Sequence, residues 1–309
     1  MIVDCYTHVW DSPAQLGRLA DSCRVPLGAS ALTVPANTLP DAGPVQHRAA
    51  RQPVDVSIVL AFRSEYLGVE ISNDDVAGYV QTDPERLIGY AGIDPSRPTQ
   101  AADEMDRALT ELGMKGIALS PAAQDLHPCH SKVDVIYERA AEAGIPIIFH
   151  PGIQTAPECV LEYAQPVLLD AVAREYPSLK IVVAHLGYPW VKETLLLLAK
   201  HDNAYSEISW LMHRPWEAYQ ALLNAHQCGV MDKLLFGSGF PYGSPTQSIE
   251  ALYGINHLCA GTNLPGIPRE VLRGIVERDA LTLLGIEHVS SAARSRADTV
   301  AVDVEGELD

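Results

Sequence analysis

An alternation of apolar, β-branched runs with helical segments constrains the fold of this chain more than any other feature. Most of the runs are continuous rather than interrupted by polar residues, which indicates strands buried on both faces of a parallel sheet. Eight strand–helix units close most naturally into a (β/α)8 TIM barrel of the α/β class. An open doubly wound sheet is the alternative, but it usually carries a phosphate-binding glycine fingerprint, and neither GxGxxG nor GxxxxGK(S/T) occurs here. Strands are expected in the opening stretch 2–10 and at 54–62, 87–93, 116–119, 145–150, 180–185, 204–209 and 233–238.

The chain is expected to form one domain. At 309 residues it exceeds the usual size of a single core, yet barrels of alternating strands and helices run this long as one unit. We expect the barrel over 1–287, with a Pro-rich excursion at 11–53 that holds one short helix, and a small acidic tail over 288–309. Helices are expected near 74–82, 99–112, 133–143, 160–176, 191–200, 216–227, 247–259 and 269–284.

Composition excludes several classes of partner. The chain has 22 Lys and Arg against 39 Asp and Glu, a net charge of -17, which repels nucleic acid and anionic lipid surfaces. No apolar run approaches the roughly 20 residues that cross a bilayer. The six cysteines form no CxxC pair, and no secretory leader pattern is present, which predicts reduced thiols in the cytoplasm. We therefore expect a cytoplasmic protein that acts on a small-molecule substrate; a homo-oligomer is left open.

Polar side chains stand where the expected strands end. A barrel places its active site at the carboxyl ends of its strands. The first strand delivers Tyr6 and His8 on one face, the fifth delivers His150, the sixth His185 and the seventh Glu207. One histidine at a strand end is more often structural, but three at the same end of separate strands favour metal binding or proton transfer.

The chain resembles a known family at several of these strand ends. The motifs are Asp4–His8, Lys115–Leu119, Phe149–Gly152, Val183–Gly187 and Leu235–Pro241. Together, in matching order, they resemble the amidohydrolase-related proteins, a group that includes aminocarboxymuconate-semialdehyde decarboxylase-like enzymes, resorcylate-type decarboxylases and pyrone-dicarboxylate lactonases. The resemblance implies a TIM barrel and a hydrolase or decarboxylase activity that depends on a divalent metal such as Zn or Mn.

The resemblance also implies roles for individual residues. His8 matches the second histidine of a metal-binding His-x-His motif, His150 matches a third ligand, and His185 matches a catalytic histidine. Two positions depart from the pattern, because Tyr6 stands at the first histidine and Gly239 stands at a metal-binding aspartate. A catalytic metal normally needs three protein ligands and an open position, so the metal site is expected to be weakened. Glu207 is the candidate substitute ligand, although a solvated carboxylate is the commoner role for a lone Glu.

Other residues are candidates for substrate binding. Arg63 follows the second strand and its planar guanidinium suits a carboxylate, but an ion pair with Glu65 or Asp94 explains it as well. Trp10 and Trp210 follow strand ends and, with Tyr6, suit the walls of a pocket for a cyclic substrate; core packing explains the tryptophans equally.

Three hypotheses follow for function. The first is a hydrolase or decarboxylase acting on a small carboxylated or cyclic substrate, with His185 as the general acid/base and a weakened metal site. The second is a metal-independent lactonase in which His185 and Tyr6 share proton transfer. The third is a non-catalytic barrel that binds a ligand or serves as an assembly subunit.

Overall fold

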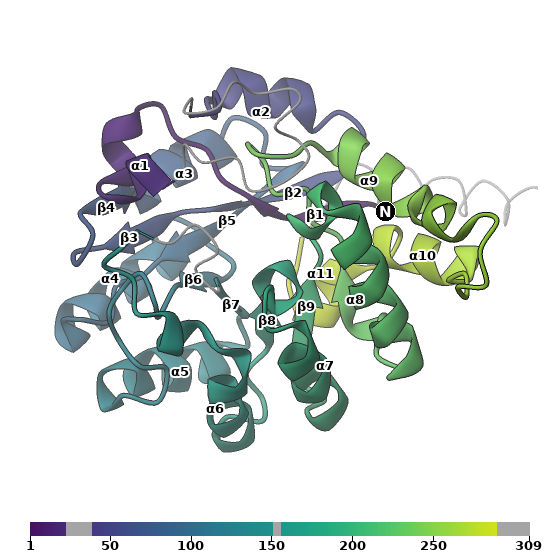
Figure 1. Ribbon diagram of the computed structural model, residues 1–309. Helices are drawn as coiled ribbons and strands as arrows, with labels where there is room; N and C mark the ends of the chain where they lie inside the picture. Colours follow the sequence, from purple (N-terminus) through teal and green to yellow (C-terminus); the bar gives the residue numbers. More distant parts are fainter. Residues whose placement is uncertain (23–38, 151–155, 289–309) are drawn as a thin grey trace, which may run out of the picture.

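The computed structural model describes residues 1–22, 39–150 and 156–288. Its centre is an eight-stranded parallel sheet in which the strands follow one another in chain order (Figure 1). All eight lie inside the ranges expected from the sequence. They are β1 (Val3–Thr7), β2 (Val56–Leu60), β5 (Leu87–Gly92), β6 (Ile117–Leu119), β7 (Ile147–Phe149), β8 (Ile181–Val183), β9 (Ala204–Glu207) and β10 (Leu234–Leu235).

Hydrogen bonds between the first and last strands bring the ends of the sheet together. The Cys5 amide donates to the Phe236 carbonyl at 2.9 Å, and the His8 amide donates to the Phe240 carbonyl at 2.9 Å. Thr7 and Phe240 form an isolated parallel bridge between these two bonds. The TIM barrel prediction is confirmed, and every strand therefore ends at the same rim.

Helices follow the strands as the sequence predicts, but three expected helices are split, those at 160–176, 247–259 and 269–284. The helix expected at 160–176 forms three shorter helices over 161–164, 166–168 and 169–175. The helix expected at 247–259 splits after Tyr253, where Gly254 separates α9 (Pro245–Tyr253) from the short η8 (Ile255–Cys259). The helix expected at 269–284 splits where Asp279 caps a new helix by accepting from the Thr282 amide. The other helices are α3 (Asn73–Val80), α4 (Pro98–Thr110), α5 (Ser131–Ala143), η3 (Leu161–Ala164), η4 (Pro166–Leu168), α6 (Leu169–Glu175), η5 (Ala184–Gly187), α7 (Val191–Lys200), η6 (Leu211–His213), α8 (Pro215–Gln227), η7 (Met231–Lys233), α10 (Arg269–Val276) and α11 (Ala280–Leu284).

The stretch after β2 holds two strands that were not predicted from the sequence. It forms an antiparallel hairpin of β3 (Phe62–Ser64) and β4 (Val69–Ile71), which turns at Gly68 with φ +66°. Only a residue that accepts a left-handed backbone suits that turn. The short strands were missed because three-residue runs give little periodicity to detect.

The Pro-rich excursion contains more helix than expected. Its described part holds η1 (Pro13–Leu16), α1 (Leu19–Ser22) and α2 (Pro44–Ala50), where one short helix was expected. Prolines begin η1 and α2, consistent with the preference of proline for the first helical turn. Residues 23–38 of the excursion and 289–309 of the expected tail lie outside the described residues.

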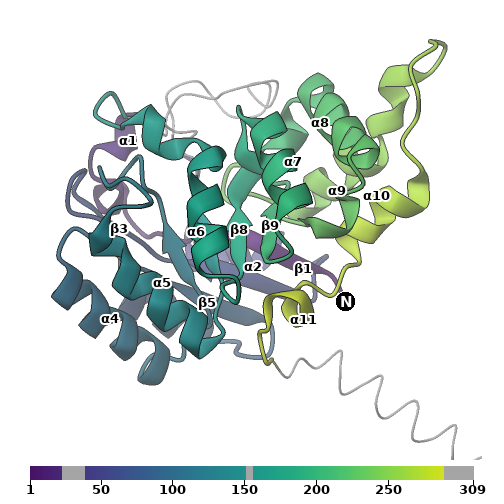
Figure 2. The same cartoon turned by 90° about the horizontal axis from the view of Figure 1, so that it is seen from below.

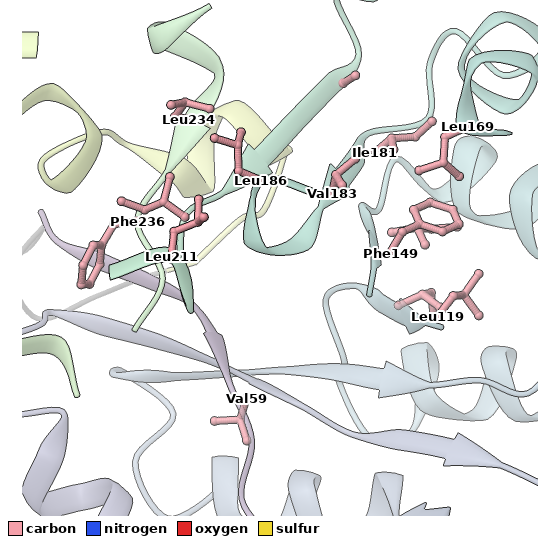
Figure 3. Close-up of a cluster of buried hydrophobic side chains, with 14 of the residues drawn as sticks. Val59, Leu119, Phe149, Leu169, Ile181, Val183, Leu186, Leu211, Leu234 and Phe236 are labelled. Carbon is pink, nitrogen blue, oxygen red and sulfur yellow. The ribbon is translucent and has the colours of Figure 1, made fainter. Parts of the chain in front are cut away.

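The main core lies between the strands and the helices around them. Figure 3 shows part of it, where Leu119 and Phe149 of neighbouring strands lie close to Leu169 of α6. Ile181 and Val183 continue this layer along β8, and each is at most 1% exposed. This packing fixes the outward face of each strand, so the alternate residues point into the barrel.

A second cluster fills the barrel interior from the amino ends of the strands. Leu281 and Leu284 of α11 pack there against Val3 and Ile88, and Figure 2 shows α11 beside β1. This end of the barrel is thereby closed, which leaves the carboxyl ends as the open rim. Among the described helices, none is both long and apolar enough to pass through a membrane.

Candidate active site

A pocket of about 890 Å³, counted with the space at its open mouth, lies at the carboxyl ends of the strands. Its floor carries the polar side chains of Tyr6, His8, Ser120, His150 and His185. Its walls are aromatic and aliphatic, with residues from the segment after β1, from β2, from the β3–β4 hairpin and from the loops after β9 and β10. The main wall residues are Trp10, Leu16, Leu60, Phe62, Val69, Ile71, Trp210, Phe240 and Tyr242.

The Tyr6 ring lies among the three histidines of the floor. Its centroid is 4.6 Å from that of His185, 5.1 Å from His8 and 6.0 Å from His150. The rings of His150 and His185 meet edge to face at 5.0 Å. The expectation that these four side chains share the barrel mouth agrees with this geometry.

The hydrogen bonds of His8 assign its tautomer. Its Nδ1 lies 3.0 Å from the Leu60 carbonyl, which only accepts, so Nδ1 carries the proton. Nε2 is then an acceptor, and the Tyr6 hydroxyl, 3.1 Å away, donates to it. Nε2 of His8 is therefore already hydrogen-bonded within the protein.

Burial keeps two of the histidines uncharged. It lowers the pKa of His8 to about 4, and the neighbouring His185 contributes in the same direction while the Leu60 bond opposes it. Burial also holds the pKa of His150 well below its usual value, and the nearby His185 and His8 add to the shift. Both imidazoles are neutral at pH 7.

His185 is held by a buried acidic network. Its Nδ1 lies 2.7 Å from Ser209 Oγ and 3.2 Å from Glu207 Oε1. The same carboxylate accepts the backbone amides of His185 and Ser209, each at 2.6 Å. No group of the described residues hydrogen-bonds to His185 Nε2, and the ring lines the pocket. This arrangement leaves Nε2 on the pocket side of the ring and places the Glu207 carboxylate beside Nδ1.

The backbone of His185 is unusual. Its φ is +57°, and Leu186 follows with φ +50°. Residues other than glycine adopt this left-handed conformation at a cost, and such strain clusters at functional sites. The bonds from Glu207 stabilise the conformation because one of them is made to the His185 amide itself.

Gly237 and Asp4 complete the surroundings of Glu207. A Cβ on Gly237 would overlap Glu207 Oε2, so only glycine leaves room for the carboxylate. The next residue, Ser238, donates its amide to Asp4 Oδ1 at 2.8 Å, while Asp4 Oδ2 is buried without a hydrogen bond. Burial raises the pKa of Asp4 from 3.8 to about 7, and the Glu207 charge adds to this effect.

We expect Asp4 to make stability depend on pH. Because its pKa is higher in the folded chain than the 3.8 of the free side chain, the folded state binds the proton more tightly. The contribution of this carboxyl to the free energy of unfolding is complete below about pH 4. It is lost as the pH rises to about 7, at about 1.4 kcal/mol per pH unit. Urea unfolding should show wild type losing stability relative to Asp4→Asn over that range. A difference between the two proteins that does not change with pH would contradict the assignment.

The structure places the other expected site residues differently. Arg63 lies outside this pocket and lines a small separate cavity with Glu65, Asp94 and Arg97. The reason is strand alternation, since Phe62 takes the pocket-facing position on β3 and its neighbour faces away. Glu207 is fully buried rather than solvated, and both of its oxygens are engaged.

Ser209 and Asp4 were missed as site residues. Ser209 stands two positions after Glu207, and the alternation of side chains along a strand, which places both on one face, was the available signal. Asp4 belongs to the opening motif, but the sequence does not show that its side chain would be enclosed beside Ser238. Trp10 and Trp210 line the pocket as expected.

The residues at the pocket centre do not fit a catalytic metal ion. The Tyr6 ring packs against the imidazoles, its hydroxyl is hydrogen-bonded to His8 Nε2, and Gly239 offers no side chain. Across 1–22, 39–150 and 156–288, no group of three His, Cys, Asp or Glu side chains is arranged to hold a metal ion. Such a site needs three protein ligands as well as an open position.

Comparisons with known proteins agree with the fold and with the resemblance. A family model described as "Amidohydrolase" matches residues 3–286. The decarboxylase orsB of Emericella nidulans is 28% identical over 142 residues, which are 37% of this chain and 43% of that protein. A gamma-resorcylate decarboxylase of a Polaromonas species is 23% identical over 216 residues, 55% of this chain and 65% of that protein. The chain therefore spans less than two thirds of each of these relatives.

A solved structure shows the same fold. A dihydroxybenzoic acid decarboxylase of Polaromonas sp. JS666, with bound manganese and the inhibitor 2-nitroresorcinol, superposes with a TM-score of 0.64. The match is 17% identical and covers 92% of this chain and 96% of that one. At this identity the likeness concerns the fold alone.

Proposed function

Because the chain belongs to the amidohydrolase family, we propose that it decarboxylates a small cyclic acid, with His185 as the general acid/base. The observation that carries the proposal is the buried Glu207 carboxylate 3.2 Å behind His185 Nδ1, with Nε2 directed to the pocket. A carboxylate in that position stabilises the imidazolium form and fixes the orientation of the ring. The decarboxylases among the relatives support this reaction class.

The reaction needs one proton transfer from the protein. His185 Nε2 donates its proton to the substrate ring carbon that bears the carboxylate. The bond between this ring carbon and the carboxylate carbon then breaks. Its electron pair restores the ring as carbon dioxide leaves. The neutral imidazole then regains a proton from water, and the hydroxide left combines with the released carbon dioxide as bicarbonate. Glu207 balances the charge of the imidazolium in each cycle.

The pocket walls suit a ring-shaped substrate. Trp10, Phe62, Trp210 and Phe240 surround the floor with aromatic surface, which favours stacked or edge-on contact with a cyclic molecule. The hydroxyl of Ser120 and the imidazoles of the floor are the polar groups that would orient it. Small-molecule sites commonly combine apolar walls with a few convergent polar groups in this way.

A substrate panel tests the proposal. We expect carbon dioxide release from one or more hydroxylated benzoic acids or similar cyclic acids, unchanged by prior treatment with a chelator. Cyclic esters in the same panel test the lactonase alternative, because that activity would release an acid without carbon dioxide. Turnover of neither class at any pH from about 5 to 8, the range in which histidine titrates, would refute an enzymatic role of His185.

A non-catalytic ligand-binding barrel is the second candidate. The Tyr6 and Gly239 departures favour it, because they fall on the groups that the family resemblance assigns to a metal centre. In that case a cyclic acid should bind and quench the fluorescence of Trp10 and Trp210, which line the pocket, yet remain unchanged. Product analysis after binding separates the two candidates.

A further inference from the structure

We infer that the Tyr6 phenol occupies the position between the imidazoles where a metal ion would have to bind, so that this site works without a resident metal. That the pocket is catalytically active without a metal rests on the proposed function, whereas the replacement of the ion by Tyr6 rests on geometry alone. Its consequence is specific: two positions, 6 and 239, decide whether the floor of this pocket is a metal centre.

The first argument is the space that the ring fills. A zinc ion bound by imidazoles lies about 2.0–2.1 Å from each nitrogen, so the ligand rings must converge on one point. In this structure the Tyr6 ring packs edge to face on His185 at 4.6 Å and stacks near His150 at 6.0 Å, so it takes space that these rings would have to share with an ion. Tyr6 is 5% exposed, so its neighbours hold it in this position.

The second argument is the lone pair of His8. An imidazole binds a metal through a nitrogen without a proton. The Leu60 carbonyl fixes the proton of His8 on Nδ1, and the remaining lone pair on Nε2 accepts the Tyr6 hydroxyl. The phenol therefore satisfies the same nitrogen that a metal would need, which keeps the buried imidazole hydrogen-bonded.

The third argument concerns the carboxylates. Gly239 lines the pocket, and its amide donates to the Tyr6 carbonyl at 3.1 Å, so a carboxylate at this position would lie beside the centre. Glycine supplies none. The buried Glu207 carboxylate is committed to the amides of His185 and Ser209.

Position 239 can accept an aspartate. A Cβ there would lie 3.3 Å from the Ser209 Cβ and 3.5 Å from the Trp210 amide nitrogen, which is close but needs only a small shift. The φ of Gly239 is +71°, and aspartate is among the residues that tolerate this left-handed region best. The double variant Tyr6→His with Gly239→Asp is therefore expected to fold.

The test is metal binding, measured by equilibrium dialysis with Co²⁺ and by its visible absorption. We compare wild type, Tyr6→Phe, Tyr6→His and the double variant, after confirming each fold by circular dichroism. Wild type and Tyr6→Phe should hold less than about a tenth of an equivalent, because both keep an aromatic ring against the imidazoles and neither supplies a third ligand. The Tyr6→His variant should bind weakly, and the double variant should bind about one equivalent with tetrahedral or five-coordinate absorption bands.

Each outcome decides the inference. One equivalent of Co²⁺ in wild type, or binding by Tyr6→Phe equal to that of the double variant, would overturn it. It would equally be overturned if neither Tyr6→His nor the folded double variant bound more Co²⁺ than wild type. The proposed function fails separately: a metal-free wild type without turnover would leave Tyr6 as the replacement for the ion but remove the decarboxylase.

Discussion

Replacing His185 by asparagine is expected to lower turnover by about 10²–10⁴-fold, the range typical of a lost general acid/base. His185 combines a carboxylate beside Nδ1 of its ring with a position in the pocket lining. Asparagine is the suitable replacement because the backbone at this position has φ +57°, a conformation that asparagine adopts readily. Its amide can also accept or donate toward Ser209, so the fold should be retained. The measurement is kcat with the best substrate of the panel.

Ser209→Ala is the matched control for this prediction. It removes the hydroxyl 2.7 Å from His185 Nδ1 but leaves Glu207 in place at 3.2 Å. The ring keeps its charge partner and loses one of its two positioning contacts, so kcat should fall by less than in His185→Asn. The pH profile of kcat should also move in Ser209→Ala, whereas a merely structural role would lower the amount of folded protein without moving the profile. Turnover by His185→Asn within about twofold of wild type would contradict a role in proton transfer.

Much of the barrel was predictable because its signal is repeated. Runs such as 145–150 and 180–185 are continuous and β-branched, and each is followed by a helix, so errors in one unit do not change the fold. The β3–β4 hairpin was not predictable in the same way, because two three-residue strands carry no repeat of their own. The division of 269–284 into α10 and α11 depended on the Asp279 cap, a local contact within an otherwise helical pattern.

The site was predictable as a set of strand ends but not as a set of contacts. The alternation of side chains along β1 correctly brought Tyr6 and His8 to one face. The same rule, applied across the end of β2, would have favoured Phe62 over Arg63 for the pocket, but the start of the hairpin was not visible in the sequence. The contact between Glu207 and His185 joins residues 22 positions apart at the ends of the paired strands β8 and β9, and no local pattern encodes it.

Removing the Glu207 side chain is expected to have the largest effect on stability. In Glu207→Ala the backbone amides of His185 and Ser209 lose their acceptor inside the protein. A buried donor left unpaired costs about 1–3 kcal/mol, so the two together cost about 2–6 kcal/mol. Folded domains are stable by only about 5–15 kcal/mol, and the variant should therefore unfold at a clearly lower urea concentration. Relief from burying a charge offsets part of this loss, which is why the lower half of the range is the more conservative expectation.

Two comparisons separate this network from a general effect of losing a carboxylate. Glu207→Gln keeps one carbonyl oxygen as an acceptor but turns an amide donor toward the other N–H group, so it should lose less stability than Glu207→Ala. Glu142→Ala, on the exposed face of α5, should change stability by no more than about 0.5 kcal/mol. Because the left-handed segment at His185 depends on the same carboxylate, Glu207→Gln should also lower kcat even where it remains folded. Wild-type kcat and stability in Glu207→Ala would show that the amides find water or another acceptor, and that Glu207 neither orients His185 nor holds the rim of the barrel together.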